Sequence, residues 1–211
     1  MADFPTTSLL SEFVGPDENP LYENGAWAQY ADRFPLQRFN NGAIVTEEFA
    51  VNGMYWTRDT YIGLAEVWAC TSGGGLGAAL ETWRVALWQD DPDSKIGYLT
   101  YYGGGIGEEY VIRRYDGGGS FTGIASLDTA GPSKIGMRLT PTHVECWAYF
   151  SGQWNFIVSA ADATYRGTFF AAVEMEEQGG IGNLGMGCFG AGVINRQHIY
   201  RVIRAKKAVP A

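Results

Sequence analysis

The sequence predicts an all-β protein, built as a sandwich of antiparallel sheets. Short runs rich in β-branched and aromatic residues show a hydrophobic period of two rather than 3.6. Each run ends at Gly, Pro, Asp, Asn or Ser, and these turn signals recur about every eight to twelve residues, the spacing typical of β-sandwiches. Glycine accounts for 29 of 211 residues, roughly twice its usual share, which indicates many tight turns.

The predicted strands run through most of the chain. In the stretch HVECWAYF, the side chains of Val144, Cys146, Ala148 and Phe150 alternate with the others and should share one face of a sheet. Strand character is found in seven runs: 43–51, 60–71, 95–102, 109–116, 134–140, 143–150 and 154–160.

The glycine-rich stretch at 68–83, WACTSGGGLGAALETW, also fits a nucleotide-binding loop. Gly73, Gly75 and Ala78 have the G-x-G-x-x-A spacing, and Asp93 follows about twenty residues later. In such a site a strand leads into the loop and a helix follows it. Whether the surrounding sequence provides this strand and helix therefore distinguishes a nucleotide site from a turn.

A turn is the better interpretation of this stretch. Leu80, Trp83 and Leu87 would line one face of a helix, but no other segment offers a helix to cover a parallel sheet. Glycine runs of the same kind recur between strand-like segments at 101–110, 115–121 and 176–187. We therefore expect hairpin turns that use glycine to reach positive φ.

The net charge and the amino-terminal sequence limit the classes of partner and the cellular location that we expect. A formal net charge of −8 argues against binding of nucleic acid, because phosphate contacts depend on Lys and Arg. The start MADFPTTSLLSEF lacks the basic and apolar regions of a signal peptide, and no stretch approaches the roughly twenty apolar residues of a membrane span. We expect synthesis in the cytoplasm and no membrane insertion.

The three cysteines, Cys70, Cys146 and Cys188, are expected to be buried, reduced thiols. They lie far apart in the sequence, form no C-x-x-C pair and are odd in number. The alternation around Cys146 gives it a core position. A zinc site would need His143 or His198 to join them.

We expect one domain over residues 1–204, followed by a basic tail at 205–211. The last sixteen residues, RQHIYRVIRAKKAVPA, contain a third of the 15 basic residues of the chain. One interpretation is a final strand through Ile199 and Ile203 with a solvated tail. The other is docking to an acidic partner or a neighbouring subunit, for which the candidate residues are Arg201, Arg204, Lys206 and Lys207.

Four stretches resemble the concanavalin A-like jelly-roll domains in their order and spacing. The first is LLSEFVGPDENPLYENGAWAQ at 9–29, and the second is VALWQDDPDSKIGYLTYY at 85–102. The third is KIGMRLTPTHVECWAYFSGQWNFIVSA at 134–160, and the fourth is GGIGNLGMG at 179–187. The resemblance implies a two-sheet antiparallel jelly roll related to lectins, laminin G-like domains and laminarinase-type glucanases.

The resemblance also suggests a role, because such domains occur in minor tail proteins and other surface parts of bacteriophage virions. The first expectation is a non-catalytic structural component of a virion, located in the particle, with other virion proteins and a homo-oligomer as its contacts. The alternative is a carbohydrate-binding adhesion module whose partner is a host-surface glycan. A laminarinase-like glycoside hydrolase is the third hypothesis for the function. Fold alone does not choose among them.

The carboxylates of the glucanase motif are incomplete, so we expect no enzyme. Glucanases of this group carry E-x-D-x-x-E on a strand, with the acids on one face to serve as nucleophile and acid/base. In AAVEMEEQGG, Glu174 and Glu176 would share a face, with Val173 and Met175 facing inward, but no Asp stands at the required place. Gln178 occupies the place of the last acid.

A candidate calcium site comes from residues of one loop. Asp90, Asp91 and Asp93 lie in one turn, and related sandwiches bind Ca²⁺ at loop carboxylates, although an ordinary turn around Pro92 is the alternative. No other cofactor is expected.

Aromatic residues beside turns could stack on sugar rings. The candidates are Tyr101 and Tyr102, before a glycine run, and Trp154, beside another turn. Packing or a protein interface are the alternatives for each of these rings. Four other tryptophans lie inside strand patterns and are expected in the core: Trp27, Trp68, Trp83 and Trp147.

Overall fold

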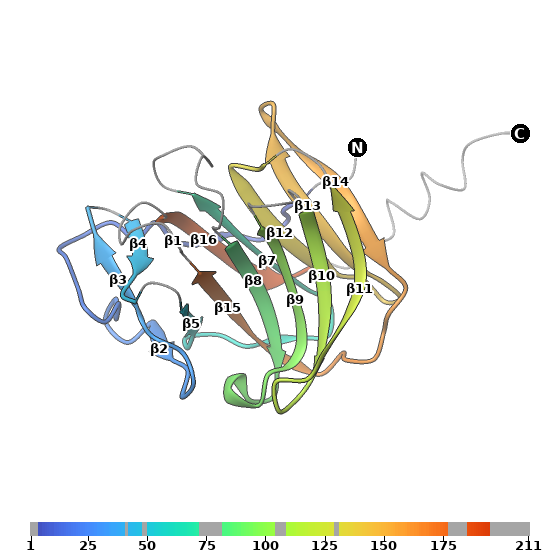
Figure 1. The fold of residues 1–211 in the computed structure, drawn as a ribbon, viewed down its shortest axis with the longest axis horizontal. Coiled ribbons are helices and arrows are strands. Elements are labelled where there is room, and N and C mark those ends of the chain that lie inside the picture. Colours follow the sequence, from blue (N-terminus) through green and yellow to red (C-terminus); the bar gives the residue numbers. More distant parts are fainter. Residues whose placement is uncertain are drawn as a thin grey trace, which may run out of the picture.

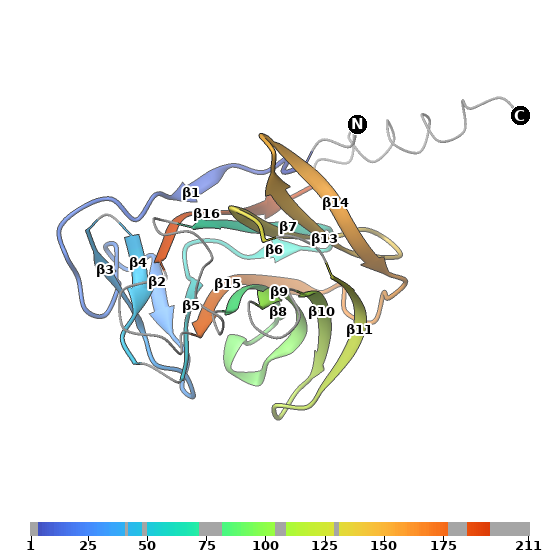
Figure 2. The same cartoon turned by 45° about the horizontal axis from the view of Figure 1, so that its top comes forward.

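A computed structural model describes residues 4–40, 42–47, 50–71, 82–103, 109–128, 131–176 and 185–194. Two antiparallel sheets pack face to face in this part of the chain, which confirms the predicted β-sandwich (Figure 1). Figure 2 shows the two layers nearly edge on. The only helical segment among these residues is the 3₁₀ turn Pro92–Ser94. No helix in the ranges given is long and apolar enough to span a membrane.

Sheet A forms one layer, and its strand order is β14-β13-β12-β7-β16-β4-β3, with β1 also paired to β16. Its strands are β1 (Leu9–Ser11), β3 (Leu36–Phe39), β4 (Gly42–Val45), β7 (Ala65–Thr71), β12 (Lys134–Leu139), β13 (Val144–Phe150), β14 (Gln153–Ala160) and β16 (Gly185–Val193).

Sheet B forms the other layer, and its strand order is β11-β10-β9-β8-β15-β5-β2, with β6 also paired to β15. Its strands are β2 (Trp27–Gln29), β5 (Val51–Trp56), β6 (Tyr61–Ile62), β8 (Thr82–Gln89), β9 (Ile96–Gly103), β10 (Glu109–Asp116), β11 (Phe121–Asp128) and β15 (Thr168–Glu176).

Two of the predicted strands are each divided between the sheets. Run 43–51 separates into β4 and β5, because the buried amide of Asn52 holds a turn between them. Its Oδ1 accepts hydrogen bonds from the backbone N–H groups of Thr46 and Glu47, both at 3.0 Å. Run 60–71 separates into β6 and β7 at Gly63, which has a φ of +78°. The other five runs are single strands.

The core lies between the sheets and consists of the inward side chains of both. Its centre is aromatic: the Trp27 ring lies 4.9 Å from Phe189 and 5.3 Å from Trp56, both edge to face. The four tryptophans expected in the core are all buried, but Trp68 and Trp147 belong to a separate cluster with Phe4 rather than to this core. Residues 82–89 form a strand rather than a helix, with Trp83, Val85 and Leu87 inward.

One of the four glycine runs lies within the described residues and forms a hairpin turn, as predicted. Gly117, Gly118 and Gly119 have φ angles of +92°, +59° and +78° between β10 and β11. The turn is closed by the Ser120 N–H, which donates to the Gly117 carbonyl at 3.1 Å. Gly73, Gly75, Ala78 and most of the other runs lie outside the described residues.

The expectation of three reduced thiols is wrong for two of them. Cys70 on β7 and Cys188 on β16 stand opposite each other, with 5.0 Å between their Cα atoms, and form a disulfide. Sequence spacing hid this pair, because 118 residues separate the two cysteines while strand pairing makes them neighbours. Cys146 is free and buried as predicted, and burial raises the pKa of its thiol to about 12.

Gly97 has a steric role at the start of β9. Its φ is +146°, and a Cβ atom there would lie 2.2 Å from the carbonyl oxygen of Leu87 on the adjacent β8. Any side chain would therefore separate two central strands of sheet B. Gly123 on β11 is a contrasting case, since its φ is not positive and nothing lies within 4 Å of an added Cβ.

Gly97→Ala should therefore lower the free energy of unfolding by about 1–3 kcal/mol, the usual cost of overpacking. Gly123→Ala is the matched control and should change it by less than about 0.5 kcal/mol. Chemical denaturation monitored by tryptophan fluorescence measures both. Equal stability of the two variants would contradict the steric role.

Candidate functional site

Strand register places a row of outward side chains across sheet B. Because directly paired residues lie on the same face, Glu174 on β15, Arg84 on β8, Tyr101 on β9 and Val111 on β10 follow one another across the outer face. These strands lie side by side in Figure 1. The predicted alternation of Glu174 and Glu176 with the inward Val173 and Met175 is confirmed.

A groove opens at the edge of this face, over β9, β10 and β11. We call it the Arg113 groove and define it by Tyr101, Glu109, Val111, Arg113 and Phe121. Its volume is about 440 Å³. The Phe121 ring is 49% exposed although it lies within a strand, so this groove offers an aromatic surface to solvent.

The guanidinium of Arg113 lies close to two rings of this groove. Its Cζ is 4.1 Å from the centre of the Phe121 ring and 4.7 Å from that of Tyr101, within the range of cation–π attraction. Its Nη2 also donates to the Tyr101 hydroxyl at 2.9 Å. Burial raises the pKa of Tyr101, while the charge of Arg113 acts in the opposite direction. The phenol therefore remains neutral at physiological pH.

An ion-paired cluster adjoins the groove. Arg84 Nη1 lies 3.5 Å from a carboxylate oxygen of Glu174, and its Nη2 donates to Glu176. Glu174 is only 1% exposed and has a second cation, Arg33, at 3.8 Å. Gly53 opposite leaves room for it, since an added Cβ would lie 2.9 Å from the Glu174 side chain. The cluster thus holds a buried carboxylate in place.

The remaining part of the outer face is covered by the chain itself. Tyr30 packs on the buried Trp88, whose indole N–H donates to the Tyr30 hydroxyl at 2.8 Å. Lys95 lies 5.4 Å from the centre of the Tyr30 ring and pairs with Asp32. A ligand that approaches this face therefore meets the Arg113 groove rather than the rings beneath Tyr30.

The three aromatic residues predicted to contact sugar lie in three different environments. Tyr101 lines the Arg113 groove. Tyr102 is 1% exposed and packs on Tyr110 in the core, because consecutive strand residues face opposite ways, so its ring is not available to a ligand. Trp154 lies on sheet A, half-buried against Phe4 at 4.8 Å.

The aspartates proposed for Ca²⁺ are used by the turn that contains them. Asp91 caps the 3₁₀ turn by accepting the Asp93 N–H at 3.0 Å, and Asp93 accepts the Ala31 N–H at 2.8 Å. Asp90 accepts from the side chain of Gln89. Within the described residues, no group of three or more His, Cys, Asp or Glu side chains could hold a metal ion. These residues do not fit a calcium site.

The proposed docking residues Arg201, Arg204, Lys206 and Lys207 lie outside the described residues. The same is true of Gln178 and of residues 195–211 as a whole. The domain boundary at 204 and the tail at 205–211 therefore stay predictions.

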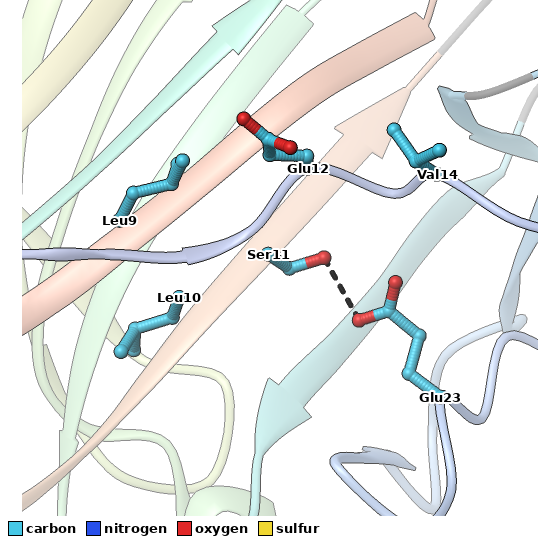
Figure 3. Close-up of a pocket in the computed structure, with 6 residues that line it drawn as sticks. All are labelled: Leu9, Leu10, Ser11, Glu12, Val14 and Glu23. Carbon is cyan, nitrogen blue, oxygen red and sulfur yellow. Dashed lines mark hydrogen bonds between the residues drawn. The ribbon is translucent and has the colours of Figure 1, made fainter.

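A second hollow lies beside β1 and has a volume of about 480 Å³. Figure 3 shows Ser11 and Glu23 pointing toward each other in it, with the Ser11 hydroxyl donating at 2.8 Å. The Glu23 carboxylate also accepts from the Trp27 indole N–H and from Arg38. Because the Glu23 carboxylate already accepts from three groups of the chain, we treat this hollow as the weaker candidate.

Arg113 and Phe121 were not singled out by the sequence reasoning. A signal for them exists in RRYDGGGSF, where a turn at 117–119 returns the chain so that Tyr115 faces Phe121. Arg113 then lies on the same face by the period of two. That inference requires the pairing register as well as the turn.

Comparison with solved structures identifies the architecture. The chain is similar to a legume lectin-like domain from Entamoeba histolytica, with a TM-score of 0.62 and 9% identity over 83% of this chain and 95% of that one. It is also similar to the exoplasmic/lumenal domain of VIP36 in its Ca²⁺/Man3GlcNAc-bound form, with a TM-score of 0.63 and 9% identity over 82% and 86%. The potassium-bound carbohydrate recognition domain of Emp46p gives a TM-score of 0.58 and 12% identity over 82% and 91%.

The fold is that of the legume lectin-like jelly rolls. No protein-family model matches the sequence, and no curated protein matches it. At these identities the similarity is one of fold. The chemistry of a site has to come from the residues of this chain.

Arg84→Ala should lower the free energy of unfolding by about 3 kcal/mol, because it leaves the buried Glu174 carboxylate without its cation on β8. Arg58→Ala removes an exposed arginine and should change stability by less than about 0.5 kcal/mol. The double variant Arg84→Met with Glu174→Gln should recover more than half of the loss. If Arg84→Ala unfolds in the same denaturant range as Arg58→Ala, the ion pair does not support the site.

Proposed function

We propose that the chain is a non-catalytic carbohydrate-binding domain that holds a glycan in the Arg113 groove. The observation that carries the proposal is the exposed Phe121 ring beside a guanidinium, a phenol and the carboxylate of Glu109, all lining one groove. Sugar rings stack their C–H faces on aromatic rings, and their hydroxyls exchange hydrogen bonds with groups of this kind. The fold supports the proposal, since the similar structures include a carbohydrate recognition domain and a mannose-containing complex.

The acidic cluster is unsuited to hydrolysis. A glycosidase needs two carboxyl groups that flank the scissile bond, with the sugar between them. Here Arg84 lies between Glu174 and Glu176 and contacts both, so its guanidinium fills the position that a substrate would need. Calcium has no part in the proposal, because the Asp90, Asp91 and Asp93 carboxylates serve the local turn.

We retain display on a bacteriophage virion as the setting in which such a domain would act. Its support is the resemblance of residues 9–190 to jelly-roll domains of virion surface proteins. In that setting the glycan would belong to the host surface, and the homo-oligomer and the tail at 205–211 would attach the domain to the particle. Glycan binding takes precedence over a purely structural role because the groove supplies chemistry for it. Cofractionation with particles tests the location.

Phe121→Ala should weaken glycan binding about fivefold or more, the expected loss from removing one stacking ring. The measurement is a glycan array followed by calorimetric titration of the strongest ligand. Phe39→Ala is the matched control, since Phe39 is 48% exposed on β3 of the other sheet, and it should bind as the wild type does. If Trp154→Ala abolishes binding and Phe121→Ala does not, the glycan site is on sheet A instead.

The wild-type chain should release no reducing ends from laminarin or from the array ligands during long incubation. Arg84 excludes substrate from the space between the two carboxylates, so Glu174→Gln and Glu176→Gln should leave this result unchanged. A reducing-end assay provides the readout. Hydrolysis by the wild type that either substitution abolishes would overturn the non-catalytic assignment.

A further inference from the structure

Arg113 differs from the other cations on the outer face of sheet B in its lack of a carboxylate partner. Arg84 pairs with Glu174 and Glu176, and Lys95 pairs with Asp32. Arg113 forms no ion pair with any carboxylate in the described part of the chain. Its sequence neighbour Arg114, by contrast, contacts Asp116 at 3.0 Å and Asp162 at 2.9 Å. The cation of the groove thus has no ion-pair partner among these residues.

The surroundings of Arg113 prepare its guanidinium for a ligand. Phe121 and Tyr101 hold it by their ring faces and supply no anionic acceptor. A guanidinium has five N–H donors, and the Tyr101 hydroxyl occupies one position among the described residues. The side chain is half-buried, so the remaining donors lie in partly desolvated space, where hydrogen bonds to an anion are stronger than in water.

Glu109 gives the groove an opposite charge at its other end. It lies four residues from Arg113 on β10, on the same face, which places their Cα atoms about 13 Å apart along the strand. Among the described residues no ion pair joins the Glu109 carboxylate to Arg113, although its charge acts on the Tyr101 phenol to which Arg113 donates. A carboxylate oxygen accepts hydrogen bonds from neutral sugar hydroxyls.

From this arrangement we infer that the Arg113 groove selects acidic oligosaccharides, with the carboxylate of one sugar residue bound to Arg113 and neutral hydroxyls near Glu109. The inference rests on the proposed glycan binding and names the ligand class. A planar guanidinium matches a carboxylate with two parallel hydrogen bonds, which a neutral hydroxymethyl group cannot provide. The net charge of −8 repels anions in general, so any preference for acid has to arise locally.

The test uses pairs of ligands that differ in charge. Oligogalacturonide is compared with its methyl ester, and 3′-sialyllactose with lactose, by calorimetric titration of the full chain. The first pair represents uronic acids and the second represents sialic acids. At least one acidic member should bind about tenfold or more tightly than its neutral counterpart. Raising sodium chloride from 50 to 500 mM should reduce that ratio.

Arg113→Gln should bring the ratio of acidic to neutral affinity close to one, and Arg113→Lys should restore part of the preference. Arg58→Gln is the matched control, because Arg58 also lies over an aromatic ring, Trp56, at 5.8 Å but outside the groove. It should keep the wild-type ratio. Circular dichroism confirms that each variant is folded.

The outcomes separate this inference from the function on which it rests. Equal affinity for acidic and neutral members, with loss of both in Phe121→Ala, would overturn acid selectivity and leave glycan binding in place. An acid preference that persists in Arg113→Gln would also overturn it, because the selectivity would then arise elsewhere. Absence of binding to all four ligands would overturn acid selectivity, and glycan binding would fall as well only if the glycan array showed no ligand.

Discussion

The pairing register of sheet B is the constraint on which the site depends. Successive strand residues face opposite sides, so a slip of one residue on β9 would exchange Tyr101 with Tyr102 and turn a groove residue into a core residue. The register is held by the inward aromatic side chains, which fit only between the sheets, and by Gly97, where no side chain can stand against the Leu87 carbonyl. The core thereby also fixes the outer face: once Trp83 and Val85 are buried, Arg84 between them has to point outward.

The outward charges then have to be compensated on their own side of the sheet. Glu174 is almost fully buried there, and Arg84 and Arg33 are its counter-ions. Tyr30 and Lys95, contributed by connections between strands, cover the neighbouring rings. What remains accessible is the edge over β10 and β11. The position of the groove follows from which part of the face the chain covers and which part it leaves open.

The fold could be predicted from the sequence because the signals for its strands are local. Alternation and turn residues identify strands such as 109–116 and 134–140 without knowledge of their partners. The division of 43–51 and 60–71 between two sheets escaped prediction, since the local pattern does not show that the Asn52 amide closes a turn at Thr46 or that Gly63 takes a positive φ. The disulfide and the groove depend on pairing between distant segments. Composition suggested aromatic residues at loops, whereas Tyr101 and Phe121 line the groove from within strands, beside an arginine whose position depends on the pairing register.

The β10–β11 hairpin has a consequence for how such a domain can diversify. Phe121 and Arg113 lie on the last two strands of sheet B, and β11 has a strand neighbour on one side only within the described chain. The outward residues of β11 can change without disturbing the interior tryptophans Trp27, Trp56 and Trp83, which come from other strands. Under the proposed function, recognition and folding are thus encoded in largely separate sets of positions. A lineage could exchange one ligand for another through a few substitutions in a single hairpin while it inherits the rest of the scaffold unaltered.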